Sequence, residues 1–129
     1  MPILLMRQGA FFNVYAWGNE QYCELVEFLA ALKQVNPSEH DKIWSRINRT
    51  ADHGRINNPQ QCRPLEGDTA NGLFELKTSG GFRVIWFYDR GHVVVCTHAF
   101  GKCSTKELKK EIQKAQSIRA AYFKEKQDE

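Results

Sequence analysis

Cys96, His98 and Cys103 lie close together in the stretch "CTHAFGKC", and these residue types could bind a metal or form a nucleophilic pair. Cys96 and His98 are two residues apart on an expected strand, so both would point to the same face of a sheet. The sequence supplies no fourth ligand at the spacing of a zinc site and no carboxylate placed to orient the histidine. We therefore expect no metal and no cofactor, with Cys96 as a small core residue and Cys103 as a loop thiol.

Basic side chains offer a second kind of chemistry, the binding of anions. Lys77 and Arg83 are expected on the two strands of a hairpin that has a Gly-Gly turn. Lys102 follows the next strand and comes just before a helix, whose free N–H groups attract anions. Lys106, in the first turn of that helix, opposes the helix dipole, and a bound phosphate would offset this unfavourable charge. Each cation alone is more simply an exposed surface residue, but together they predict one basic rim.

The first half of the chain is expected to form one strand and two helices. The strand covers residues 9–17, which are apolar and rich in aromatic residues. The first helix ends at Pro37, and its expected apolar face consists of Tyr22, Leu25, Val26, Leu29 and Leu32. The second helix is expected to have Ser38 as its cap and Gly54 as its stop. Its buried stripe consists of Ile43, Trp44 and Ile47.

The second half predicts a loop, a meander and a helix. Residues 54–72 are rich in Gly, Asn and Pro and predict a long connecting loop. Residues 73–100 contain three strand patterns separated by turns, which predict an antiparallel meander. Ser104 and Glu107 form a capping-box sequence that starts the last helix. The inward face of that helix is expected to consist of Leu108, Ile112, Ala115 and Tyr122.

These elements predict an α+β fold for residues 1–129, a single domain of ordinary size. The predicted sheet is antiparallel and contains the N-terminal strand and the three strands of the meander. Two N-terminal helices and one C-terminal helix would cover mainly one face of it.

The composition of the chain indicates its cellular compartment and the kinds of partner it could bind. The four cysteines contain no C-x-x-C pair, which in a cytosolic chain favours reduced thiols over disulfides. No apolar run reaches the roughly 18 residues of a membrane span, and no signal peptide is visible, so we expect a cytoplasmic protein. The net charge of +3 alone indicates no nucleic-acid partner, although basic residues predominate from Lys102 onward.

Four sequence motifs follow one another in the second half of the chain. They are "LFELK", "FRVIWFYD", "HAFGK" and "EIQKAQSIRAAY", within residues 73–122. In this order and spacing the chain resembles the phage-derived, HigB-like branch of the RelE/HigB toxin superfamily. None of the motifs is diagnostic alone, but four in register argue against a chance similarity. The superfamily pattern has a second lysine where this chain has Cys103, and Lys106 is an approximate substitute.

The resemblance implies a toxin of a type II toxin–antitoxin system. Such a toxin is a small endoribonuclease that cleaves mRNA, typically on the ribosome, and a helix-turn-helix antitoxin protein silences it. Carried onto this sequence, the family's basic positions fall on Lys77, Arg83 and Lys102, and a further one falls near Arg63.

Cleavage of RNA without a metal uses the neighbouring 2′-hydroxyl as nucleophile, so the protein must move protons and stabilise a dianionic phosphorane. Arg83 suits the phosphate because a guanidinium can bind it through two hydrogen bonds. Lys77, Lys102 and Lys106 could carry protons when like charges surround them. His98 is the candidate that titrates closest to neutral pH, with a buried structural histidine as the equal alternative. The expected RNA-binding residues are Arg63, Lys106, Lys109 and Lys110.

Two other functions fit the same residues. The superfamily scaffold also occurs in ParE-like toxins that inhibit DNA gyrase without catalysis, and there the basic helix would bind a protein. The chain could also be an inactive phage-derived protein that binds an antitoxin-like partner.

Overall fold

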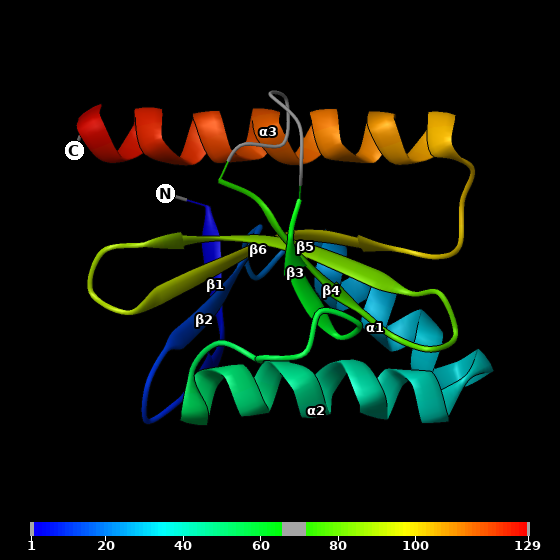
Figure 1. The fold of residues 1–129 in the computed structure, drawn as a ribbon. Helices are drawn as coiled ribbons and strands as arrows, with labels where there is room; N and C mark the ends of the chain where they lie inside the picture. The colour runs from blue at the N-terminus through cyan, green and yellow to red at the C-terminus, as the bar shows by residue number, and fades with distance from the viewer. Residues whose placement is uncertain (1, 66–71, 129) are drawn as a thin grey trace.

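A computed structural model of the chain describes residues 2–65 and 72–128 and shows one six-stranded sheet between helices (Figure 1). The strands are β1 (Ile3–Gln8), β2 (Asn13–Trp17), β3 (Cys62–Pro64), β4 (Phe74–Lys77), β5 (Arg83–Asp89) and β6 (Val93–Phe100). The helices are α1 (Glu24–Val35), α2 (Pro37–His53) and α3 (Thr105–Asp128). The predicted α+β class is confirmed. Within the described ranges, no helix has the length and apolar character needed to cross a membrane.

The sheet is mixed, whereas the sequence predicted an antiparallel one. The strand order is β1-β2-β6-β5-β4-β3, and β4, β5 and β6 form the predicted antiparallel meander. β2 runs parallel to β6, with Val14 opposite Val94 and Ala16 opposite Cys96. Parallel neighbours need a long connection, and here two helices and three other strands lie between β2 and β6 along the chain.

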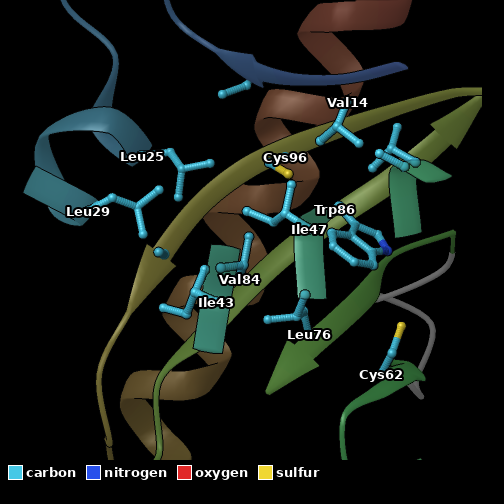
Figure 2. Close-up of a cluster of buried hydrophobic side chains, with 14 of the residues drawn as sticks. Val14, Leu25, Leu29, Ile43, Ile47, Cys62, Leu76, Val84, Trp86 and Cys96 are labelled. Atoms are coloured by element: carbon cyan, nitrogen blue, oxygen red, sulfur yellow. The ribbon is translucent and has the colours of Figure 1, made fainter. Parts of the chain in front are cut away.

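Helices cover both faces of the sheet, which corrects the expectation that they would lie mainly on one face. Val84 and Trp86 of β5 belong to a core that includes residues of α1 and α2, and Ile85 and Phe87 belong to a second core that includes residues of α3. Figure 1 shows α2 and α3 on opposite sides of the sheet. Because β5 is apolar at consecutive positions, both of its faces need a cover. Figure 2 shows the larger core, on the α1 and α2 side.

β1 is an edge strand that was not predicted, and it pairs antiparallel with β2. The strand expected over residues 9–17 begins only at Asn13, because the residues before it turn the chain between β1 and β2. The backbone N–H groups of Phe11 and Phe12 both donate to the carbonyl oxygen of Ala51, at 2.8 Å. This turn is therefore fixed to the C-terminal end of α2.

β3 lies inside the loop that was predicted over residues 54–72. It pairs with β4, with Cys62 opposite Leu76 and Arg63 opposite Glu75. A strand of three residues at a sheet edge leaves almost no alternation in the sequence, so no pattern indicated it. The remainder of that predicted loop at residues 66–71 lies outside the described residues.

α1 is shorter than expected at its N-terminus. It begins at Glu24, and the side chains of Tyr22 and Val26 are 61% and 37% exposed. Both were expected on the apolar face, so this part of the prediction is wrong. The apolar face is narrower and consists of Leu25, Leu29 and Leu32.

α2 begins at Pro37, and Asn36 rather than Ser38 caps it. The Asn36 side chain accepts a hydrogen bond from the backbone of the third helical residue, and proline is favourable at the first helical position. The stop at Gly54 is confirmed, with a φ of 91° that favours glycine. Ile43 and Ile47 are buried as predicted, and Trp44 is partly buried.

α3 begins as predicted, after Ser104. The Ser104 hydroxyl oxygen accepts from the Glu107 backbone N–H at 3.2 Å, which satisfies one free donor of the first turn. Ala115 and Tyr122 are buried against the sheet as expected. The Tyr122 hydroxyl donates to Asp89 at 2.6 Å and fixes the C-terminal half of α3 to the end of β5.

We predict that Gly9→Ala destabilises the fold. A Cβ at this position would lie 2.2 Å from the carbonyl oxygen of Ala51, and backbone cannot move away cheaply. We expect the free energy of unfolding to fall by about 1–3 kcal/mol in urea denaturation. Gly101→Ala is the matched control, because its Cβ would lie 3.6 Å from the nearest atom, on Phe82. Equal stability of the two variants would contradict this packing.

Candidate nucleic-acid interface

Five basic side chains line one cavity of about 730 Å³ beside the turn between β4 and β5. They are Arg46, Arg63, Lys77, Arg83 and Lys102, and we call this the basic cavity. The structure therefore brings together Lys77, Arg83, Lys102 and Arg63, which were predicted from the sequence. It adds Arg46 of α2, which the sequence reasoning missed. The residues that line the cavity in the described part of the chain include no Asp, Glu or His.

Strand pairing positions these cations. Lys77 at the end of β4 lies opposite Arg83 at the start of β5. Arg83 also lies opposite Phe100, the last residue of β6, and Lys102 follows just beyond. Arg63 lies on β3, the strand on the other side of β4. Because these ends meet at one corner of the sheet, residues distant in the sequence share one cavity.

Two glycines let the turn between β4 and β5 pass close to its neighbours. A Cβ on Gly80 would lie 2.5 Å from the carboxyl carbon of Glu39. Gly81 has a φ of 87°, and a Cβ there would lie 3.2 Å from the Cβ of Lys102. The sequence therefore needs glycine at both positions to hold the turn against α2 on one side and Lys102 on the other.

Glu39 of α2 clamps this turn. The side chain of Lys42 donates both to Glu39 and to the Ser79 hydroxyl, each at 3.1 Å. A hydrogen bond from Thr78 and the interaction with Lys42 hold the pKa of Glu39 below its ordinary value of 4.5, although burial opposes this. Above that pH the carboxylate is therefore charged and binds the turn to α2.

Glu75 is a buried carboxylate that holds two of the arginines. Its side chain is 1% exposed. Arg83 Nε lies 3.0 Å from one of its oxygens and Arg63 Nε lies 3.2 Å from the other. The sequence reasoning assigned no role to this residue, yet alternation in "LFELK" places it on the same face as the arginine and was a usable signal.

Arg46 fixes the end of β4 from the helix side. Its Nη1 donates a hydrogen bond to the backbone carbonyl of Lys77. Arg46 lies between Ile43 and Ile47, the buried residues of α2, which places its backbone close to the sheet. A cation in an amphipathic helix is ordinarily a solvated residue, so the sequence pattern gave no reason to single it out.

Cys96 and His98 face opposite sides of the sheet, so the expectation that they share a face is wrong. Cys96 lies opposite Trp86 and His98 opposite Ile85, which makes Thr97 an extra residue in β6. Such a β-bulge reverses the alternation beyond it. Cys96 therefore joins the core on the α1 and α2 side (Figure 2), and His98 lies under α3.

His98 is fully buried and is not among the residues that line the basic cavity. Its Nε2 lies 2.7 Å from the Glu111 carboxylate of α3, and its Nδ1 lies 3.0 Å from the Thr97 hydroxyl. Burial lowers the pKa of His98 below its ordinary value of 6.5, although Glu111 opposes the shift. The ring is therefore neutral near pH 7 and donates its Nε2–H to Glu111, which joins β6 to α3.

The lysines of α3 do not reach the basic cavity. Lys106, Lys109 and Lys110 are exposed, and none of them is among its lining residues. Lys110 lines a second cavity of about 240 Å³ at the start of α3, together with Cys103 and Glu111. This cavity also includes Lys102, which therefore stands between the two cavities.

The thiols offer little reactivity. Cys23, Cys62 and Cys96 are buried and free, and Cys103 is partly exposed. Burial raises the pKa of Cys62 to about 11 and also raises that of Cys96, which disfavours the reactive thiolate. The expected role of Cys96 as a small core residue is confirmed. No group of three or more His, Cys, Asp or Glu side chains suited to a metal occurs among the residues that the structure describes.

A family model described as phage-derived protein Gp49-like matches residues 30–120 of this chain. The chain belongs to this family. The matched residues include every basic residue of the cavity, together with Glu39 and Glu75. The Gp49-like family is a RelE/HigB-like family of toxins from toxin–antitoxin systems, so the resemblance stated from the sequence is confirmed at that level. A search of curated proteins gives no match for this chain.

We predict that Glu75→Gln destabilises the protein, because two guanidinium groups lose their shared carboxylate. We expect the free energy of unfolding at neutral pH to fall by about 1–3 kcal/mol, less than for a fully buried ion pair because Arg63 is half exposed. Denaturation in urea measures the change. Glu125→Gln, at an exposed position of α3, is the control, and we expect it to change stability little. The prediction fails when both variants unfold at the same urea concentration.

We predict that His98 makes the protein less stable as the pH falls below neutral. The pKa of His98 is lower in the folded chain than in the unfolded chain, so protons favour the unfolded state. Stability is full above about pH 6.5 and declines as the pH falls from there toward the folded-state pKa. Urea denaturation between about pH 7.5 and pH 5.5 should show a decline that is smaller in His98→Gln. An identical decline in both proteins would contradict the assignment.

Proposed function

We propose that this chain is the toxin of a type II toxin–antitoxin system and acts as a metal-independent endoribonuclease on mRNA. The observation that carries the proposal is the basic cavity, where cations from α2, β3, β4, β5 and the segment after β6 meet and the described lining residues include no carboxylate. A site of this charge suits the phosphodiester backbone of RNA. Membership of a toxin family supports the toxin role.

Electrostatic stabilisation of the phosphorane is the first task of such a site. Arg83 is fixed by its Nε contact with Glu75, so its terminal nitrogens have a defined direction. A guanidinium held in this way needs little reorganisation when charge develops on the phosphate oxygens. Arg63, held by the same carboxylate, adds a second oriented guanidinium.

Proton transfer is the second task, and we assign it to Lys77 and Lys102. Both side chains line the cavity, and neither forms an ion pair with another described residue. An amine that is free of a carboxylate partner can approach the 2′-hydroxyl or the leaving 5′ oxygen. We assign His98 no contact with RNA, because its ring is buried under α3.

The proposal includes cleavage on the ribosome, silencing by an antitoxin and a cytoplasmic location. The resemblance to the toxin superfamily supports cleavage on translating ribosomes and silencing by a helix-turn-helix antitoxin protein. A partner that blocks the basic cavity would silence the toxin directly. Translated mRNA as the substrate places the protein in the cytoplasm.

We predict that Arg83→Gln and Lys102→Gln each reduce cleavage of mRNA on translating ribosomes. Loss of the Arg83 guanidinium, which stabilises transition-state charge, reduces the rate by roughly 100-fold to 1000-fold. Loss of the Lys102 amine, which transfers a proton, reduces it by roughly 100-fold to 10,000-fold. Lys102 is exposed and forms no ion pair with a described residue, so its replacement should leave the fold intact. Induced expression of either variant should arrest growth less than the wild-type protein does.

Arg90→Gln is the matched control, because Arg90 is exposed in the turn between β5 and β6, at the opposite end of β5. We expect its cleavage rate to equal that of the wild type. Supercoiling by DNA gyrase, measured with the same preparations, tests the gyrase alternative. Inhibition of gyrase without cleavage of RNA would reject the endoribonuclease proposal. Full cleavage by Lys102→Gln would reject the role assigned to Lys102.

A further inference from the structure

A second hollow opens along α2 and continues the basic cavity. Its volume is about 610 Å³, and we call it the α2 groove. Arg46 and Gln61 line both spaces, so the two are continuous at these side chains. The groove extends from there to Arg49 and Lys42. The proposed function assigns no role to this part of the surface.

Helix geometry aligns the cations of the groove. Lys42, Arg46 and Arg49 are spaced four and three residues apart, which places them on one side of α2. Ile43 and Ile47 of the same helix are buried in the core. The line of positive charge therefore runs along the helix and ends at the basic cavity.

These cations differ in how many hydrogen bonds and ion pairs they already form within the protein. Lys42 is bound to Glu39 and Ser79. Arg46 donates from one nitrogen to a backbone carbonyl and forms no ion pair with any described residue. The Arg49 side chain is exposed and forms no ion pair or hydrogen bond with any described residue. It is therefore the cation of the groove with the most freedom to bind a ligand.

Acidic charge in the groove is small. Asp41 is the carboxylate among the described residues that line it, and its oxygen lies 2.9 Å from the ring of His40. Ser38 and Ser45 add hydroxyl groups, and Gln61 adds an amide. Positive charge combined with neutral donors suits a phosphate backbone better than it suits an apolar partner.

We infer that the α2 groove binds the continuation of the RNA strand whose scissile phosphate lies in the basic cavity. Arg46 stands at the junction, and Arg49 binds a phosphate of a nucleotide beyond the cleaved one. This inference rests on the proposed function and adds a substrate length: a strand long enough to occupy both spaces binds more tightly than a short one. Single-stranded sites in other proteins cover about 4–16 nucleotides, so one strand can span both.

Binding of 2′-O-methyl RNA tests the inference, because this RNA lacks the nucleophilic hydroxyl and is not cleaved. We expect Arg49→Gln to weaken binding of a strand of about 12 nucleotides and to leave binding of a trinucleotide unchanged. Loss of one phosphate contact lowers the slope of log Kd against log salt concentration by about 0.7 for a single strand. Fluorescence anisotropy at several salt concentrations measures both quantities.

Two controls keep the result interpretable. Arg90→Gln removes another exposed arginine, at the far end of β5, and should change neither the affinity nor the salt slope. Ser45→Glu places a carboxylate in the groove and should weaken binding of the long strand alone. Ser117→Glu, at an exposed position of α3, is its match and should have no such effect.

The outcomes separate this inference from the proposed function. If Arg49→Gln and Ser45→Glu bind the long strand as tightly as their controls, the α2 groove is not part of the RNA-binding surface. If Arg83→Gln nevertheless binds that strand weakly, the basic cavity is still part of it. When the wild-type protein binds neither RNA, this inference is rejected, and cleavage of mRNA on translating ribosomes decides the proposed function separately. Selective weakening by both groove variants supports the inference.

Discussion

The basic cavity depends on one buried carboxylate. Glu75 lies on β4, between the two strands that carry Arg63 and Arg83, and it binds both guanidinium groups. Cations gathered in one cavity repel one another, and long basic side chains ordinarily extend toward water. A carboxylate fixed in the sheet opposes both tendencies. It compensates part of the charge and gives the arginines a direction.

The second constraint is that β5 and β6 pack against helices on both faces of the sheet. One face of β5 packs against α1 and α2, and the other packs against α3. The bulge at Thr97 changes which face each later residue of β6 meets. It buries His98 under α3, where Glu111 binds the ring. The polar side chains of "CTHAFGKC" therefore lie in two different places. His98 binds α3, and Lys102 lines the basic cavity.

The sequence predicted much of the fold and part of the site, and its failures have physical causes. The meander, the stop at Gly54 and the start of α3 followed from local patterns, and so did the meeting of Lys77 with Arg83. The parallel partner of β6 could not be predicted, because pairing between distant strands is set by the whole fold. A bulge leaves no mark in composition, so the face of His98 was assigned wrongly. Arg46 was missed because a cation on a helix surface is common.

The charge of the cavity is better explained by a ligand than by folding. Five cations line it, and among the described residues one buried carboxylate, Glu75, compensates part of their charge, so these cations still repel one another. Departures of this kind from local stability are typical of functional sites. A polyanion that binds the folded state alone removes the repulsion and stabilises the fold by mass action. The contacts of Glu39 with Lys42 and Thr78 hold the turn between β4 and β5 against α2. The site is therefore organised before a ligand binds. A cluster of surface cations without a function would not require contacts that fix the neighbouring turn.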